Sequence, residues 1–421
     1  MIEKNLNAPQ KKERLAALRE LISLHKSGES ETPAKIENIN NHIHTTYSFS
    51  PYSPTGAVYT AWKAGLATAG IMDHDSMAGA REFIEAGKIA NLAVTIGFEF
   101  RCDMSGTPFN GKKFNNPDQA SVAYFAVHGV PHAEIDRAED FLRPFREKRN
   151  VRNRAMTDNA NRIFLPHGIK IDFDADVIPV SNYNEGGGVT DRHILYALSK
   201  KIIEAAGRGE KLINFLEKNL GINVSGGNLT RIMDTDNEMY VYFLLNILRG
   251  QLTERFYVPA TDECPPVFEL LAFADEIGAI AAYPYLGDVT DSVTGDKKTQ
   301  RLEDEYLDDY IKYLKKIGVN AVTFMPTRNT ASQLARVMNL CDAHDMFQIC
   351  GEDINSPFQS FICEALVKPE FKHLIESAWA LVGHENSIKG NGIFSKKIIS
   401  KTDLQERIKY FAEIGKKTAA Y

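Results

Sequence analysis

The sequence predicts an α/β fold in which a barrel of strands and helices carries an inserted, mostly helical subdomain. Short apolar segments alternate with amphipathic segments of about 10 to 15 residues along most of the chain, as in sheets whose strands are joined by helices. This alternation stops between about residues 135 and 260, where the pattern is mostly helical. A chain of 421 residues that is 43% hydrophobic can bury the core that such a fold needs.

Seven strands are expected, and they favour a barrel of parallel strands over an open sheet. The strands are expected at about 36–44, 68–73, 92–100, 121–128, 277–285, 319–325 and 346–353. Helices are expected between them at 54–65, 77–90, 266–276, 302–317 and 330–343.

The chain is expected to divide into four parts. These are an N-terminal helical extension (1–35), the first part of the barrel (36–134), the helical insertion (135–260), and the second part of the barrel with C-terminal helices (261–421). In the extension, Leu15, Leu18 and Ile22 share one face of a helix over 11–26. The insertion is expected to contain helices at 137–165, 191–206, 208–219 and 236–250, with glycine-rich loops at 181–188 and 225–228.

Histidines at the end of the first expected strand are the strongest chemical signal. His42 and His44 are separated by one residue, so both imidazoles project from the same face of the strand. Imidazole is a favoured ligand of zinc, iron and manganese-like ions. In isolation such a pair is more often two ordinary polar strand residues without a metal.

Other strand ends carry residues of the same chemical kind. Asp73 and His74 end the second strand, Glu99 lies near the end of the third, His128 ends the fourth, and Asp353 ends the last. Active sites of barrel enzymes are built at the carboxyl ends of the strands. Carboxylates in such apolar surroundings are costly unless they are paired or bind a cation. A metal ion would explain Glu99 and Asp353 together, and a salt bridge could explain either one alone.

The order of these motifs resembles the PHP (polymerase and histidinol phosphatase) phosphoesterase family. The similar segments are HIHTTYS, IMDHDS, GFEF, a histidine on the next strand, and GED near the C-terminus, within about 38–130 and 265–356. DRHILYAL (191–198) is similar to a motif in the insertion of the nucleoside-phosphate-hydrolysing branch. The resemblance implies a distorted (β/α)7 TIM-like barrel with divalent metal ions, such as Zn, Mn or Fe, at its carboxyl rim.

The resemblance also implies roles for individual residues. His42, His44, Glu99 and Asp353 match the first metal site of the family, with Glu99 bridging to a second ion. His74 matches a ligand of a further site, and Asp73 is expected to orient it. His128 is expected as a ligand although it lies two residues beyond the family position. His74, His128 and Asp73 form the expected catalytic set.

Three positions depart from the family pattern. Tyr283 stands where the family has histidine in Ala-His-Pro, and Asn355 stands where it has the histidine of Asp-x-His. Phe49 or Ser50 replaces an expected aspartate or histidine. One or two metal ions are therefore expected, and three only if other residues fill these positions.

The expected activity is hydrolysis of phosphate esters by a metal-bound hydroxide, as a phosphomonoesterase or a short-oligonucleotide phosphodiesterase. Leaving-group protonation is assigned to His74, His128 or a water. The segment RPFREKRNVRNR is strongly basic, and guanidinium groups suit phosphate oxygens. Arg152, Arg154, Arg192 and His193 are the expected substrate-binding residues. Most arginines of such a segment form a solvated helix face instead, and His193 could equally be a core residue.

Composition limits the partners and the location. A net charge of -6 argues against a broad basic face for duplex nucleic acid, so a small phosphorylated substrate, a nucleotide or short oligonucleotide, is expected. The chain shows neither an apolar run of membrane-spanning length nor an apolar N-terminus, which predicts a cytoplasmic protein without membrane contact. The five scattered cysteines suggest neither disulfides nor a cysteine zinc cluster. Oligomeric state is not predicted.

Two alternatives remain open from the sequence. Tyr283 and Asn355 would suit a PHP-like binding protein that has lost catalysis, and the complete first site argues against it. An amidohydrolase-type barrel also opens with His-x-His, but the strands here offer Glu99 and no metal-bridging lysine.

Overall fold

A seven-stranded sheet forms the centre of the computed structural model, which describes residues 2–289, 301–387, 392–399 and 402–418. The strands follow one another in chain order around the sheet. They are β1 (Ile39–Ile43), β2 (Thr68–His74), β3 (Ala93–Asp103), β4 (Val122–His128), β5 (Ile280–Tyr285), β6 (Ala321–Phe324) and β7 (Phe347–Cys350). A bridge between Ile43 and Ile354 brings the last strand back to the first, so the sheet is a nearly closed barrel. The predicted α/β barrel and its strands are confirmed.

One strand runs against the predicted direction. β4 pairs antiparallel with both β3 and β5, whereas the other neighbouring pairs are parallel. The prediction of an all-parallel sheet is therefore wrong at β4. Residues 104–121, between β3 and β4, contain no helix, and a connection without a crossover helix returns the chain in the opposite direction.

Helices cover the barrel, and their apolar faces build the main core against the outer face of the sheet. These helices are α1 (Lys11–Lys26), α2 (Pro54–Lys63), α3 (Ala80–Ala90), α9 (Val267–Ile277), α10 (Leu307–Lys316) and α11 (Ala331–Ala343). Three further helices follow β7, namely α12 (His373–Glu385), α13 (Lys396–Ile399) and α14 (Leu404–Thr418). α12 packs with α14 against Ile280, Ala282 and Ile349, which builds a second apolar cluster with the strands.

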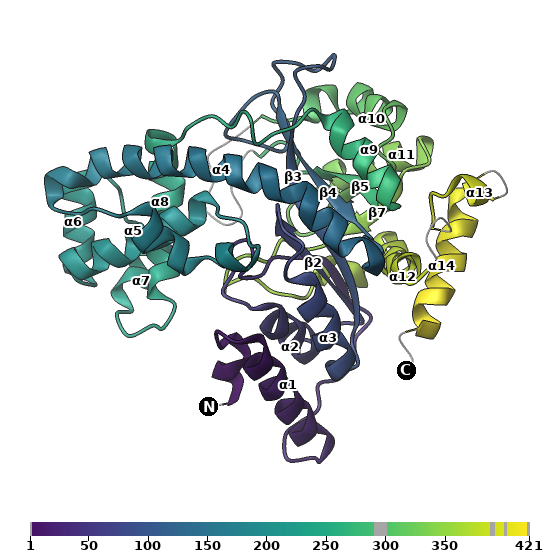
Figure 1. The fold of residues 1–421 in the computed structure, drawn as a ribbon, viewed down its shortest axis with the longest axis horizontal. Coiled ribbons are helices and arrows are strands. Elements are labelled where there is room, and N and C mark those ends of the chain that lie inside the picture. Colours follow the sequence, from purple (N-terminus) through teal and green to yellow (C-terminus); the bar gives the residue numbers. More distant parts are fainter. Residues whose placement is uncertain (1, 290–300, 388–391, 400–401, 419–421) are drawn as a thin grey trace.

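Between β4 and β5 the described chain is helical, as predicted. The elements are α4 (Ile135–Phe164), α5 (Asp191–Ala206), α6 (Glu210–Leu220), α7 (Gly227–Met233) and α8 (Tyr240–Phe256), of which α7 was not predicted. α5 to α8 lie to one side of the barrel, and α4 runs from the barrel into them (Figure 1). This part has its own apolar core, into which Phe49 extends from the turn after β1. Every helix among the described residues is too short or too polar to cross a membrane.

Candidate metal centre

The closure of the barrel positions two of the predicted ligands. His44 N donates to Ile354 O at 2.9 Å, and Ile354 N donates to His42 O at 3.1 Å. Gly351 permits this approach, because a Cβ there would lie 2.6 Å from His42 N. As a result Asp353 Oδ1 lies 3.1 Å from His44 Nε2, although 309 residues separate the two in the chain.

Glu99 lies at the centre of the group. His74 and Glu99 are paired in the register of β2 and β3, and His74 Nδ1 lies 3.0 Å from Glu99 Oε2. The same oxygen lies 3.9 Å from His42 Nε2 and 4.0 Å from His44 Nε2. Ligand atoms of His42, His44 and Glu99 all lie within 4.8 Å of one another. The structure thus brings together five predicted residues from β1, β2, β3 and the segment after β7. We call them the group, and they are His42, His44, His74, Glu99 and Asp353.

Burial lowers the pKa of His44, but contact with Asp353 and the charges of nearby carboxylates outweigh burial and raise it. Burial is also the largest influence on the other groups. It raises the pKa of Glu99 to about 8 and lowers the pKa of His42 to about 4. It also lowers the pKa of His74 well below its usual range. Burial opposes ionisation of Asp353 too, but contact with His44 and the charges of His42 and Arg192 hold the pKa of this carboxyl well below its usual range. The imidazoles of His42 and His74 are therefore neutral at pH 7, as metal ligands must be.

The donor set fits a divalent cation. The buried nitrogens His44 Nε2 and His74 Nδ1 both face carboxylate oxygens, Asp353 Oδ1 at 3.1 Å and Glu99 Oε2 at 3.0 Å. Both face a carboxylate for which burial disfavours the charged form. A cation among them would accept the nitrogen lone pairs and compensate Glu99. Imidazole and carboxylate together suit Zn, Mn or Fe.

Asp73 supports His44, which differs from its predicted contact with His74. Its carboxylate accepts hydrogen bonds from Thr45 N, Thr45 Oγ1 and Ser48 Oγ, each at 2.6 Å. Ser48 Oγ also lies 3.2 Å from His44 Nδ1. Because Ser48 gives its proton to Asp73, it accepts one from His44 Nδ1, which leaves Nε2 free for a metal. Asp73 precedes His74 on a strand, so the two side chains point to opposite faces.

His128 lies one layer deeper in the barrel than predicted for a ligand. On β4, Ala126 is opposite Glu99, and His128 is opposite Gly97. His128 faces the barrel interior, but it is outside the three-residue group found among the described residues. Burial lowers its pKa to about 3, and its Nε2 is buried without a partner. The antiparallel course of β4 carries this histidine away from the rim.

Tyr283 and Asn355, two of the three departures from the family pattern, have structural roles. Tyr283 points to the face opposite to Ala282, which shares the face of Glu99 through Ala126. Its ring packs in the outer core, and its hydroxyl accepts a hydrogen bond from Asn115 N. Tyr283 therefore does not fill the position of a ligand. Asn355 instead donates from Nδ2 to Asp353 Oδ1 at 2.7 Å and so orients that carboxylate.

The predicted substrate-binding residues occupy different places. Arg152 is buried and donates to Glu263, whereas Arg154 forms a paired contact with Asp174 on the surface. The charge of Arg192 acts on Asp353, so this arginine lies near the group. His193 belongs to the capping box of α5, where its Nδ1 accepts from Thr190 N, and its ring packs against Phe49. The structure thus keeps Arg192 near the group and gives His193 a structural contact.

Sequence reasoning missed a buried arginine beside the group. Arg149 donates to the Asp75 carboxylate, and Arg146 donates to the Asp75 carbonyl. Asp75 directly follows His74 and adopts a left-handed backbone conformation with φ 55°, which aspartate tolerates better than most residues. Arg146, Arg149 and Asn153 recur at helical spacing on the buried face of α4. This helical spacing was the signal available in the sequence, because it distinguishes arginines that face the barrel from arginines that face solvent.

A family model decides the classification of the chain. The model of the PHP domain matches residues 40–421. The chain belongs to the PHP domain family. No curated protein matches the chain significantly. The first 39 residues, which include α1, lie outside the match.

Two solved structures resemble this PHP protein over most of its length. A candidate metal-dependent phosphoesterase from Bifidobacterium adolescentis shares 18% identity with a TM-score of 0.49, covering 80% of this chain and 96% of that chain. An amidohydrolase from Chromobacterium violaceum, with bound sulfate and no metal, shares 14% identity with a TM-score of 0.51. The match covers 81% of this chain and 96% of that chain. The second likeness shows the fold. Family membership, together with the group of His42, His44 and Glu99, supports a metal-dependent hydrolase.

Proposed function

We propose that this PHP protein hydrolyses phosphate esters of small molecules, with nucleotides or short oligonucleotides as the substrate class. His42, His44, Glu99 and Asp353 would hold the divalent ion. When bound, such an ion lowers the pKa of a coordinated water and offsets negative charge on phosphoryl oxygens. The observation that carries the proposal is the position of this group beside buried arginines.

Three buried arginines next to the group outnumber the two carboxylates that they contact directly. Arg101 and Arg152 both contact Glu263, and Arg149 contacts Asp75, so three buried cations share two carboxylates. The Nε atoms of Arg101 and Arg149 are buried without a hydrogen-bond partner. An excess of guanidinium groups attracts a phosphate dianion more strongly than a neutral amide or lactone.

Arg149 connects this charge to the metal group. Its charge acts on His74 and on Glu99. The ring centroid of Tyr124 lies 5.6 Å from that of His74, and the Arg101 guanidinium lies over the same Tyr124 ring. These residues would orient the phosphate on the rim side of Glu99, since Arg101 and Tyr124 are paired two residues beyond Glu99 towards the end of β3.

Solvent exposure separates the two candidate proton donors. The side chain of His74 is 22% exposed and that of Asp353 is 37% exposed, so substrate can approach from this side. His128 is buried in a deeper layer. Because the His74 imidazole is neutral, we assign the proton delivered to the leaving group to a water on the exposed side of His74 and give His128 no contact with substrate.

A substrate panel tests the proposal. Protein stripped of metal and reloaded with Mn²⁺, Zn²⁺ or Fe²⁺ is incubated with nucleoside monophosphates, short oligonucleotides, amides and lactones. We expect metal-dependent release of inorganic phosphate or of mononucleotides. Amide or lactone turnover without phosphate-ester turnover would identify an amidohydrolase, and binding of nucleotides without turnover would identify a binding protein.

A matched pair of variants controls for contaminating phosphatases. Asp353→Asn changes a carboxylate beside His44, whereas Glu352→Gln changes its neighbour, whose carboxylate contacts Thr327 instead. We expect the first variant to lose the activity and the second to keep it. Equal activity in both would show that the turnover does not arise at this site.

A further inference from the structure

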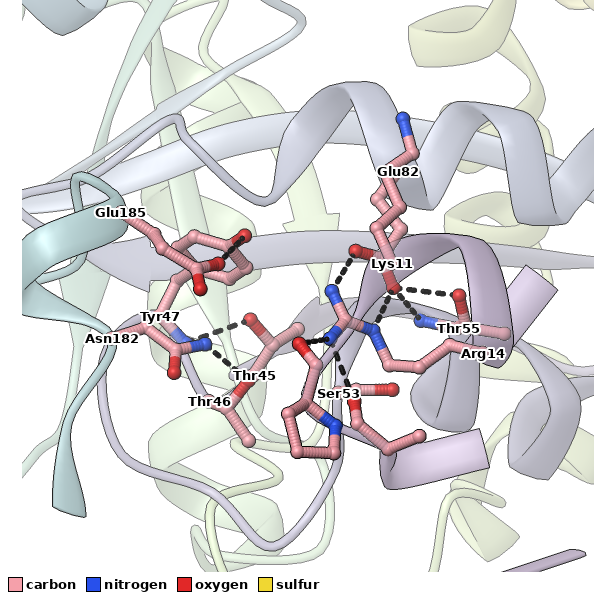
Figure 2. Close-up of polar contacts among 12 residues, drawn as sticks. Lys11, Arg14, Thr45, Thr46, Tyr47, Ser53, Thr55, Glu82, Asn182 and Glu185 are labelled. Carbon is pink, nitrogen blue, oxygen red and sulfur yellow. Dashed lines mark hydrogen bonds and ion pairs between the residues drawn. The ribbon is translucent and has the colours of Figure 1, made fainter. Parts of the chain in front are cut away.

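A glycine-rich loop of the insertion, residues 181–188, lies against the turn that follows the first metal-site histidines. Gly188 N donates to Tyr47 O at 2.7 Å, and Asn182 Nδ2 donates to Thr46 Oγ1 at 2.9 Å. Tyr47 Oη donates to Glu185 at 3.1 Å. Figure 2 shows Asn182 and Glu185 beside Thr46 and Tyr47. This turn starts at His44, so the loop contacts the chain directly after a predicted ligand.

The same loop contacts the turn that follows β2. Ser76 Oγ donates to Gly186 O at 2.8 Å. A Cβ added at Gly188 would lie 2.7 Å from the carbonyl oxygen of His74, closer than real Cβ atoms come to other atoms. A Cβ at Gly187 would lie 2.9 Å from Tyr47 O. Only glycine therefore allows the loop to approach both turns at once.

The loop is also fixed from the side of the insertion. Asn153 Nδ2, on the buried face of α4, donates to Val189 O at 2.9 Å. Glu139, also on α4, accepts from Met77 N at 2.9 Å in the turn after β2. The loop is thus held between α4 and two turns of the barrel, one following His44 and one following His74.

We propose that Tyr47, Asn182 and Gly188 are positioning residues that set the distance between His44 and His74, so that the insertion controls the affinity of the barrel for its metal ion. The two imidazoles stack with centroids 4.6 Å apart, and His44 Nε2 and His74 Nδ1 lie 4.0 and 3.0 Å from the same oxygen, Glu99 Oε2. A shift of either turn would move one nitrogen relative to Glu99. This inference rests on the proposed function only in requiring that the group binds a metal ion.

Metal affinity measured without turnover tests the inference. Apoprotein is titrated with Mn²⁺ alone by calorimetry, and its Tm is measured in parallel. We expect Gly188→Ala to weaken Mn²⁺ binding about tenfold or more, the range seen when groups that support metal ligands are altered. Asn182→Ala and Tyr47→Phe each remove a single contact and are expected to weaken binding in the same direction by a smaller factor.

The control is Gly227→Ala in α7 of the same insertion, where an added Cβ meets nothing within 4 Å. It should keep the affinity of the wild type. Lower apoprotein Tm with unchanged Mn²⁺ affinity in the three variants would show a merely structural loop and overturn the inference. If Gly188→Ala does not fold, the Mn²⁺ affinities of Asn182→Ala and Tyr47→Phe test the inference. Absence of Mn²⁺ binding by the wild type would instead contradict the proposed function.

Discussion

Ser48 sets the protonation of a metal-site histidine, although it is not itself a ligand. It donates to Asp73 and lies 3.2 Å from His44 Nδ1. Because His44 Nδ1 keeps its proton for Ser48, the lone pair of Nε2 is directed towards Glu99 and Asp353. The correct tautomer of one ligand therefore depends on a hydroxyl four residues further along the chain.

We expect Ser48→Ala to lower metal affinity by about 10-fold to 100-fold, because His44 loses the acceptor that orients it. The control is Ser50→Ala in the same turn, whose hydroxyl accepts from Tyr52 N instead. Titration of both apoproteins with Mn²⁺ gives the comparison. Equal affinities in the two variants would show that Asp73 and Ser48 do not set the tautomer.

The ligand residues could be predicted from the sequence, but their supporting contacts could not. His42 and His44 follow from the alternation of side chains on a strand, and Glu99 follows from the position of active sites at strand ends. The contact of Asp73 with Ser48 depends on how the turn after β1 folds back over β2. No spacing in the sequence encodes that contact.

At the scale of elements, α4 presents a polar face to the barrel and a second polar face to solvent. Arg149 lies on the buried face beside Asp75, and Arg154 lies on the exposed face beside Asp174. The basic segment therefore contributes to the site through residues at helical spacing and not as a whole. The basic composition indicated this segment, but the residues predicted to bind substrate within it were Arg152 and Arg154.

We expect Arg149→Lys to raise the KM for phosphate esters about tenfold, because an ammonium group cannot reproduce the fork of a buried guanidinium. Arg154→Lys is expected to leave KM unchanged, since its contact with Asp174 is on the surface. Steady-state kinetics of both metal-loaded variants provides the measurement. A larger change from Arg154→Lys would reverse this assignment.

α12 carries a carboxylate whose burial makes stability depend on pH. Glu385 accepts from Ile96 N at 2.8 Å, and burial raises its pKa to about 7 despite the nearby His132. The pKa in the folded state exceeds the unfolded value of about 4.3, so the stabilisation is complete below that value and is lost as pH rises through 7.

We expect Glu385→Gln to remove this dependence, since an amide oxygen can still accept from Ile96 N. The free energy of unfolding of the wild type should fall relative to the variant by up to about 3 kcal/mol between pH 5 and pH 8. Urea unfolding at several pH values measures this difference. Glu376→Gln on the same helix is the control, and a parallel change in both variants would argue against the role of burial.

At the scale of the whole molecule, the N-terminal extension is bonded into the barrel although it lies outside the family match. Arg14 of α1 donates to Glu82 of α3 at 2.8 and 2.5 Å, and Glu82 also accepts from Thr55 of α2 (Figure 2). The two charged side chains are 5% and 2% exposed. The pair thus ties three helices together in a buried setting.

We expect Arg14→Met to lower the free energy of unfolding by about 3 kcal/mol or more, because it leaves a buried carboxylate without its cation. The double variant Arg14→Met with Glu82→Gln should recover part of this loss. Arg19→Met removes a surface pair with Glu85, 57% and 41% exposed, and should cost less than about 1 kcal/mol. Equal losses from the two arginine variants in urea unfolding would contradict this account.

The barrel could be predicted because alternating strands and helices leave a clear pattern in the sequence, and the order of motifs placed the ligands on its rim. The direction of β4 could not be predicted from its apolar pattern, since that pattern reads the same in both directions. Its direction in turn places His128 below the group and Ala126 opposite Glu99. The missing helix in 104–121 was the one signal that could have indicated it.

The most direct test is anomalous diffraction from crystals grown with Mn²⁺, with wild type and Glu99→Gln compared. The account predicts a peak in the wild type within coordination distance of His42, His44 and Glu99, and its loss in a folded Glu99→Gln protein. A wild-type map that is empty between these side chains at saturating Mn²⁺, Zn²⁺ and Fe²⁺, or a peak that persists unchanged in Glu99→Gln, would contradict it.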